Sequence, residues 1–291
     1  MLLYNLRMAW WNTALSPAAP AAKSKANDET YKIIGNHLKR LFTEFSCDLV
    51  AICEVSSEDV DHISSNLNLS NVEVLDLTCK AGRTRFDIAV IYNNQKVRLD
   101  HLHSLSKIRT SNTIKAAQVV EIENVDDSSK IQLFLCHWAS RLNGDSEVRR
   151  KSAADIVYSS AQELMEASND VIIMGGFNDN PYDESILQNL NATRCHDAVR
   201  KHPNEYFYNP FWRSVVSEEK YNHLVSDKSF RSGTHKYKQM LGTIWHSYVF
   251  EFNHRHRLVV DYRFRAQHEI RGEIHEWKHD ILLLFGSNTL S

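Results

Sequence analysis

The stretch VIIMGGFNDNPYDES, which runs from Val171 to Ser185, carries the pattern that decides the fold class. It begins with a short apolar run of the kind that forms a strand buried on both faces of a sheet. It then passes through two glycines into a cluster of carboxylates and amides. In α/β proteins, loops that follow buried strands are where binding and catalytic side chains gather. The stretch therefore predicts a buried strand that leads into a site loop.

Expected strands and helices interleave on both sides of this stretch, and several strands follow one another without a helix between them. Strands are expected at residues 4–11, 48–55, 72–77, 86–93, 97–102, 117–122, 131–140, 259–264 and 281–285, and helices at 29–45, 146–168 and 184–190. In the helix at 146–168, the residues expected to line the inner face are Val148, Ala153, Ile156, Val157 and Leu164. This order favours α/β layers with mixed sheets, in a single domain over residues 1–291.

Composition narrows the class of protein. The chain has 291 residues, 43% hydrophobic and 24% charged, which is enough apolar sequence for a sizeable core. A formal net charge of −2 gives no overall basic field for nucleic acid. No run approaches the roughly 20 apolar residues of a membrane span, and no basic region precedes the apolar N-terminus, so we expect neither a span nor a signal peptide. Five scattered cysteines predict free thiols and a reducing, cytoplasmic location.

Polar side chains recur where the expected strands end, at Asn12, Glu54, His137 and Asn178. Such strand ends can meet at one rim of a sheet. Glu54 offers carboxylate oxygens to Mg²⁺ or Mn²⁺, and Asn12 would tune that metal position or orient a water molecule. His137 can donate to a phosphate oxygen or move a proton near neutral pH. Arg141 offers a planar fork to a nonbridging phosphate oxygen.

Each of these residues also has a structural interpretation. A glutamate at a strand end is more often solvated or caps a helix, and a histidine after an apolar run is more often a satisfied structural residue. Asn178 and Asp179 lie in a turn-rich loop, where such side chains commonly bond to the backbone. Only the joint pattern favours a site.

Five motifs, taken in order, resemble the endonuclease/exonuclease/phosphatase family, which includes DNase I-like nucleases. They are WWN at 10–12, AICEV at 51–55, FDIAVIYN at 86–93, CHWASR at 136–141 and GGFNDNPYDES at 175–185. The segments YNPFWRS at 208–214, SGTHKYK at 232–238 and TIWHS at 243–247 look like a bacterial branch of that family. The resemblance implies an α/β fold, namely a four-layer α/β sandwich with two central mixed β-sheets, as in DNase I-like proteins.

The resemblance also implies a Mg²⁺-dependent phosphodiester hydrolase of the nuclease type, with DNA or RNA as the default substrate and lipids or inositol phosphates as alternatives. Asn12 and Glu54 match the family's metal-side residues, and Asn12 and Arg141 are also expected to contact the substrate. His137 matches the histidine beside the scissile phosphate, and Asn178 matches the asparagine of the G-D-x-N motif. In such a site the metal stabilises charge on the phosphate, and water attacks in line.

The sequence departs from the family pattern at three carboxylate positions. Gly176 stands where G-D-F-N has the aspartate that orients or deprotonates the attacking water. Relatives have an aspartate about four residues after the tryptophan of TIWHS, where this chain has Val249, with Asp261 as a later match. Near the end of the chain, His279 matches the catalytic histidine of an S-D-H triplet, and Lys278 replaces its aspartate.

These departures predict weakened general acid/base chemistry, because one such group contributes about 10²–10⁴-fold to the rate. Asp179 and Asp183 are the nearby carboxylates that would have to replace the missing one. The alternative is a pseudoenzyme that binds a phosphate-containing ligand without cleaving it. A remote alternative is a zinc peptidase, because HEWKH at 275–279 matches H-E-x-x-H, a motif that needs a helix. The apolar run that follows it favours a strand instead.

Overall fold

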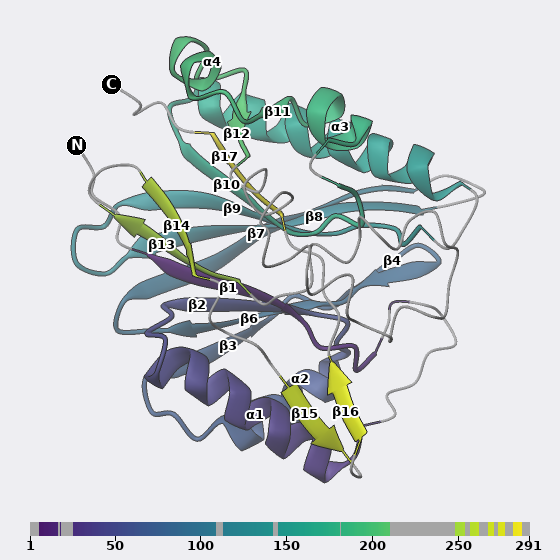
Figure 1. The fold of residues 1–291 in the computed structure, drawn as a ribbon, viewed down its shortest axis with the longest axis vertical. Coiled ribbons are helices and arrows are strands. Elements are labelled where there is room, and N and C mark those ends of the chain that lie inside the picture. Colours follow the sequence, from purple (N-terminus) through teal and green to yellow (C-terminus); the bar gives the residue numbers. More distant parts are fainter. Residues whose placement is uncertain are drawn as a thin grey trace.

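The computed structural model describes residues 6–16, 18, 26–108, 113–141, 145–180 and 182–209, and the backbone of five strands between residues 248 and 286. Two β-sheets lie face to face at its centre, and helices cover their outer faces (Figure 1). The fold is therefore the four-layer α/β sandwich with two central sheets that the sequence predicted.

The first sheet has six strands in the order β14-β13-β1-β2-β6-β3. They are β1 (Arg7–Asn12), β2 (Leu49–Cys53), β3 (Val72–Asp76), β6 (Ile88–Asn93), β13 (Tyr248–Asn253) and β14 (Arg257–Asp261). The sheet is mixed, because β1 and β2 pair in parallel whereas β2 and β6 pair antiparallel. The parallel pair brings Asn12 opposite Cys53, next to Glu54.

The second sheet has seven strands in the order β11-β12-β17-β10-β9-β8-β7. They are β7 (Val97–Ile108), β8 (Thr113–Asn124), β9 (Lys130–His137), β10 (Asp170–Gly176), β11 (Ala192–Thr193), β12 (Phe207–Tyr208) and β17 (Leu282–Gly286). β9 and β10 run in parallel, so their last residues, His137 and Gly176, lie opposite each other. In each sheet, two buried strands therefore end at or next to candidate site residues.

Helices form the two outer layers (Figure 1). α1 (Asp28–Thr43) and α2 (Ser57–Leu67) cover the first sheet, and α3 (Ser146–Glu166) and α4 (His196–Lys201) lie over the second, with a short π-helix, η1 (Ser185–Asn189), beside α3. α1 and α2 both begin with capping boxes, in which Asn27 and Ser56 accept from the backbone three residues on. These caps satisfy backbone donors that the helices themselves cannot.

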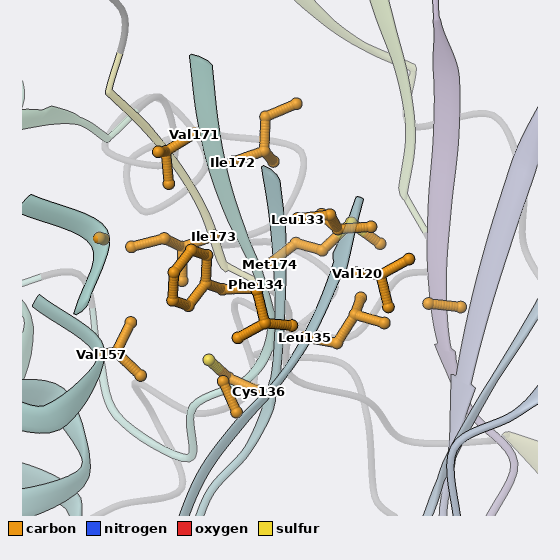
Figure 2. Packing of buried hydrophobic residues seen from close by; sticks show 14 of the residues in the cluster. Val120, Leu133, Phe134, Leu135, Cys136, Val157, Val171, Ile172, Ile173 and Met174 are labelled. Atoms are coloured by element: carbon orange, nitrogen blue, oxygen red, sulfur yellow. The ribbon is translucent and has the colours of Figure 1, made fainter. Parts of the chain in front are cut away.

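The hydrophobic core follows from strand alternation. In β1, Met8 and Trp10 belong to the cluster between the sheets, whereas Trp11 belongs to the cluster under α1 and α2. In β9, Leu135 points toward the first sheet and Phe134 points toward α3 (Figure 2). Because successive side chains of a strand face opposite sides, one strand fills two layers of the core. This is why the predicted strands read as almost continuous apolar runs.

One expectation about α3 is wrong. Val148, which was expected on the inner face, is 66% exposed, whereas Ala153 and Val157 are buried as expected. The buried stripe of α3 starts at Ser146. Val148 follows Ser146 by two residues, or about 200° around a helix, and therefore faces solvent.

Several elements were not predicted from the sequence. They include α2 and two small hairpins, formed by β4 (Cys79–Ala81) with β5 (Thr84–Phe86) and by β15 (Gln267–Ile270) with β16 (Glu273–Glu276). The zinc-peptidase alternative is wrong, because His275 and Glu276 lie on the strand β16 and not on the helix that H-E-x-x-H requires. The rest of that motif, including Lys278 and His279, lies outside the described residues.

All five cysteines lie in the described part of the chain, and none forms a disulfide, which confirms the prediction of thiols. Cys47, Cys53 and Cys136 are buried, whereas Cys79 and Cys195 are exposed. Burial raises the pKa of Cys47 to about 12, so this thiol is unreactive at neutral pH. Among the described residues, no helix is both long and apolar enough to cross a membrane.

Candidate active site

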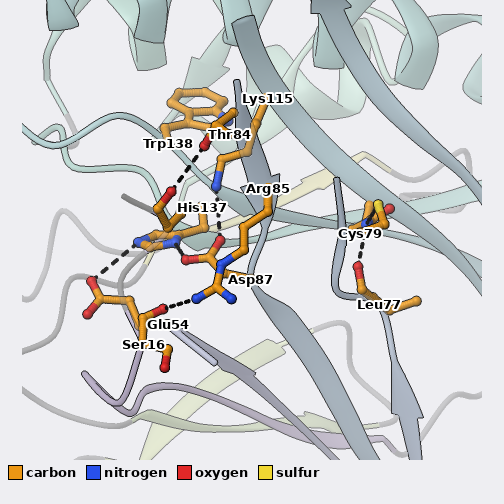
Figure 3. Close-up of polar contacts among 12 residues, drawn as sticks. Ser16, Glu54, Leu77, Cys79, Thr84, Arg85, Asp87, Lys115, His137 and Trp138 are labelled. Atoms are coloured by element: carbon orange, nitrogen blue, oxygen red, sulfur yellow. Dashed lines mark hydrogen bonds and ion pairs between the residues drawn. The ribbon is translucent and has the colours of Figure 1, made fainter. Parts of the chain in front are cut away.

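His137 lies at the end of β9, between two carboxylates. Its Nδ1 lies 2.8 Å from Oδ2 of Asp87, and its Nε2 lies 3.8 Å from Oε1 of Glu54. Figure 3 shows the imidazole between these two side chains, with Lys115 on the other side of Asp87. The contact with Asp87 fixes the ring, so that Nε2 is the nitrogen directed toward Glu54.

Asp87 is the site residue that sequence reasoning missed. It is fully buried just before β6, and its Oδ1 accepts from Nζ of Lys115 at 3.0 Å. Burial by itself would raise the pKa of Asp87, but the charges of His137 and Lys115 outweigh it and hold the pKa well below its usual range. Asp87 is therefore a buried, ionised carboxylate. Asp87 belongs to the motif FDIAVIYN, but nothing in the sequence indicated that it contacts Lys115 and His137, which lie 28 and 50 residues further along the chain.

Glu54 follows β2 in a left-handed backbone conformation, with φ of 58°. Non-glycine residues rarely adopt this conformation, and when they do it often marks a functional site. Two contacts with the loop after β1 hold it. Ser16 N donates to Glu54 O at 2.5 Å, and Thr13 Oγ1 donates to the carbonyl of Cys53 at 2.9 Å. The loops after β1 and β2 thus support each other's backbone.

Asn12, the last residue of β1, contacts Glu54 directly. Its Nδ2 donates to Oε1 of Glu54 at 3.0 Å, and its Oδ1 accepts from the backbone of Ala14 at 2.9 Å. The amide therefore presents a donor to the carboxylate. In this arrangement Asn12 orients Glu54, and its roles as metal ligand and substrate contact stay predictions.

Asn178 lies in the loop after β10 and also has a left-handed backbone, with φ of 54°. Its Nδ2 donates to the carbonyl of Trp138 at 3.0 Å. This bond joins the loops that follow β9 and β10, and it leaves Oδ1 as the amide atom available to a donor. His137 thus ends β9 and Asn178 follows the end of the neighbouring strand β10, as the sequence predicted for a common rim.

The guanidinium group of Arg141 is already bound to other residues of the protein. Its Nε donates to the carbonyl of Asn178 at 2.8 Å, and its Nη2 contacts Asp179 at 2.7 Å and also pairs with Asp183. The predicted contact of Arg141 with a substrate phosphate stays a prediction. What the structure adds is that both candidate replacement carboxylates, Asp179 and Asp183, are bound by this arginine.

The described residues contain no group of three or more His, Cys, Asp or Glu side chains that could hold a metal ion. A Mg²⁺ site does not need such a group, because Mg²⁺ is commonly held by one or two carboxylates together with substrate phosphate oxygens and water. Glu54 is a partly exposed carboxylate at the rim, beside the amide of Asn12. The donor set therefore fits a hard cation shared with a phosphate substrate and does not fit a closed protein cage.

The last part of the predicted site is only partly described. Val249 lies on β13 opposite Ala9 of β1, and Asp261 lies opposite Val249 on β14. The Asp261 backbone is therefore one strand further from β1 than the position it was expected to replace. His279 lies outside the described residues, and its catalytic role stays a prediction.

The sequence profile of the endonuclease/exonuclease/phosphatase family matches residues 17–228, which is most of the chain. The chain belongs to the endonuclease/exonuclease/phosphatase family. No curated protein sequence matches it significantly.

Solved structures of this family share its fold. A family member from Bacteroides thetaiotaomicron superposes with a TM-score of 0.53 at 12% identity, over 98% of each chain. A mannosyl-6-phosphatase from the same species gives 0.53 at 12% identity, over 96% of this chain and 98% of that chain. TDP2 of D. rerio, complexed with a single-strand DNA product, gives 0.50 at 12% identity, over 99% of this chain and 86% of that chain. At such identities the likeness concerns the fold alone.

Proposed function

We propose that this endonuclease/exonuclease/phosphatase family member is a divalent-metal-dependent phosphoesterase that hydrolyses phosphodiesters slowly. The observation that carries the proposal is the placement of His137, which contacts a buried ionised carboxylate through Nδ1 and faces Glu54 through Nε2. An imidazole held in this way can donate to a phosphate oxygen or move a proton. A solely structural histidine would not need a second carboxylate at the rim.

The residues take separate roles in this proposal. Glu54 would hold Mg²⁺ or Mn²⁺, and Asn12 orients its carboxylate. A bound Mg²⁺ would supply charge stabilisation to the phosphate. His137 would donate from Nε2 to a phosphate oxygen while Asp87 holds its other nitrogen. Asn178 would donate to the same phosphate through the second N–H of its side-chain amide.

Lys115 adds a cation that the sequence did not single out. Its Nζ is 3.0 Å from Asp87, and its side chain is 13% exposed. With a protonated His137, Asp87 would have two cationic partners, and the three groups would carry one excess positive charge. This excess supports a site that meets a negatively charged substrate.

Slow turnover is expected because Gly176 carries no carboxylate to orient or deprotonate the attacking water. Asp179 and Asp183 do not compensate, since both are engaged by Arg141. The same observation favours the second candidate, a pseudoenzyme that binds a phosphate-containing ligand and does not cleave it. The two candidates share Glu54 and His137 and differ only in turnover.

The proposal covers several substrate classes. One relative by fold is named a mannosyl-6-phosphatase, and another was solved with a single-strand DNA product. We take DNA or RNA as the first substrate to test and small phosphoesters as the second. The formal net charge of −2 gives nucleic acid little general attraction. Five cysteines without a disulfide support a cytoplasmic location.

The test is hydrolysis of bis(p-nitrophenyl) phosphate, p-nitrophenyl phosphate and plasmid DNA with Mg²⁺ or Mn²⁺. We expect weak, metal-dependent turnover that falls about 10²–10⁴-fold in His137→Ala. The matched control is His103→Ala, because His103 is an exposed histidine of β7. No turnover by the native chain, but turnover by Gly176→Asp, would select the pseudoenzyme. Turnover that is insensitive to both His137→Ala and metal removal would contradict both candidates.

A further inference from the structure

We infer that Arg150 is a positioning residue for Asn178, acting through a partly buried ionic cluster that fixes the loop after β10. This cluster, the Asp179 clamp, consists of Arg141, Arg150, Asp179, Asp183 and Ser185. The effect on turnover rests on the proposed function, whereas the effect on the loop does not.

Asp179 is the centre of the clamp. Its side chain is 4% exposed, and its Oδ1 lies 2.7 Å from Nε of Arg150 and 2.7 Å from Nη2 of Arg141. Its Oδ2 accepts from Oγ of Ser185 at 2.5 Å. Charged side chains are almost never fully buried unless they are paired. With Asp183 also bound to Arg141, the clamp contains two cations and two carboxylates, so its formal charges cancel.

The clamp reaches Asn178 through Arg141. Nε of Arg141 donates to the backbone carbonyl of Asn178, next to Asp179, while the side-chain amide of Asn178 donates to Trp138 O. Asn178 is therefore held at both its backbone and its side chain, in a left-handed conformation that asparagine adopts more readily than most residues.

Arg150 anchors the clamp to a rigid element. It is buried on α3, a helix of 21 residues, and its Nη1 donates to the carbonyl of Ala139 at 3.1 Å. One side chain thus contacts both loops that carry the site, at Ala139 after β9 and at Asp179 after β10. Arg141 lies on one of these loops and cannot provide the same fixed reference. Loss of Arg150 would leave Asp179 with Arg141 and Ser185, and the two loops without their common support.

The turnover test uses Arg150→Met in the wild-type and Asn178→Ala backgrounds. We expect kcat to fall about 10–100-fold with KM within about threefold, because a misplacement of about 1 Å can cost about 10²-fold. In the Asn178→Ala background, Arg150→Met should cause no further fall in kcat. Arg150→Lys, which keeps the charge but loses the second arm, should recover part of the rate. The control is Arg200→Met, which removes an exposed arginine paired with Asp197 on α4.

A second readout needs no activity. In ¹⁵N-labelled protein, we expect the side-chain amide signal of Asn178, fixed by its bond to Trp138, to shift in Arg150→Met and stay unchanged in Arg200→Met. If the native chain has no turnover, the proposed function fails while this readout still decides the clamp. An unchanged Asn178 signal in a folded Arg150→Met or Arg150→Lys protein would overturn the inference. So would an equal fall in kcat with and without the Asn178 amide.

Discussion

Asp87 Oδ2 lies 2.8 Å from His137 Nδ1, and this contact joins the first sheet to the second at the site. Asp87 precedes β6 of one sheet, and His137 ends β9 of the other. The distance between the sheets therefore sets the orientation of the imidazole. A change that shifts one sheet relative to the other would therefore alter the distance between Asp87 and His137.

The first prediction concerns the stability that this pair provides. Asp87→Asn keeps the shape but removes the negative charge shared by His137 and Lys115. We expect the free energy of unfolding to fall by about 3 kcal/mol, because breaking a buried charge pair leaves the remaining charges uncompensated. Urea unfolding measures this change, with Asp61→Asn, an exposed carboxylate of α2, as the control. A loss as small as that of the control would mean that Asp87 is not ionised in the folded chain.

The second prediction concerns acid pH. The pKa of Asp87 is lowered in the folded state by His137 and Lys115 despite its burial, so the unfolded chain binds more protons on acidification. The stability from Asp87 is present above its usual pKa of about 3.9 and is lost as pH falls from there toward the lowered value. We expect Asp87→Asn to lose stability less steeply than wild type between about pH 4 and pH 2. Equal slopes in urea unfolding at these pH values would contradict the assigned charge state.

The third prediction separates the two glycines of the site loop. Gly175 has φ of +153°, and a Cβ there would lie 1.8 Å from the carbonyl oxygen of Cys136. Gly175→Ala should therefore lower the free energy of unfolding by about 3 kcal/mol or more. Gly176 is not among the described glycines with positive φ, so Gly176→Asp should fold without backbone strain, but with a lower melting temperature than wild type because it places a carboxylate at a buried position. It should also raise turnover of bis(p-nitrophenyl) phosphate by at least about tenfold. A well-placed general base contributes about 10²–10⁴-fold, and imperfect placement of the new carboxylate would remove part of that gain.

The result for Gly176→Asp has a clear contrary outcome. A folded Gly176→Asp protein with unchanged turnover would show that the missing carboxylate is not what limits the site. The next position to test would be Lys278, where the resemblance predicts the loss of an aspartate that partners the family's histidine.

The fourth prediction concerns metal binding at Glu54. If Glu54 holds the cation, saturating Mn²⁺ at about 100 times its dissociation constant should stabilise the native chain by about 2.7 kcal/mol. Glu54→Gln should lose this effect, because it replaces the carboxylate with an amide. Differential scanning fluorimetry with and without Mn²⁺ makes the measurement, with Glu58→Gln on α2 as the control. Equal stabilisation of Glu54→Gln would place the metal elsewhere.

The central strands were predictable because they are apolar on both faces, whereas their arrangement in a four-layer sandwich followed from the family resemblance. All five residues of β2 are buried, and β10 is buried from Val171 onward, so each reads as a short continuous apolar run. α2 was missed although Ser56 and Asp59 form a capping box at its start, which was the available signal. The exposure of Val148 shows how a single apolar residue in a first helical turn misleads a periodicity argument.

The candidate site was predictable only where a residue ends a strand or follows it closely. Glu54, His137 and Asn178 were found in that way, and each lies at the rim that the strand order implies. Asp87 and Lys115 were not found, because their importance depends on a meeting of two sheets and not on any local spacing. Arg141, Asp179 and Asp183 were each singled out, but their contacts with one another and with Arg150 were not, since the clamp joins a loop, a helix and a second loop.

The fifth prediction concerns the thiols. Cys79 and Cys195 are exposed, whereas the other three cysteines are buried. Burial raises the pKa of Cys47 to about 12 and also raises that of Cys136, so neither forms the reactive thiolate at pH 8. We expect Ellman's reagent to modify two thiols rapidly in the native chain and all five after denaturation. Cys79→Ser and Cys195→Ser should each remove one fast equivalent. A third fast equivalent that persists in the double variant would show that β2, β9 or the segment before β2 that carries Cys47 opens on the timescale of the reaction. The sandwich core would then be less stable than its packing suggests.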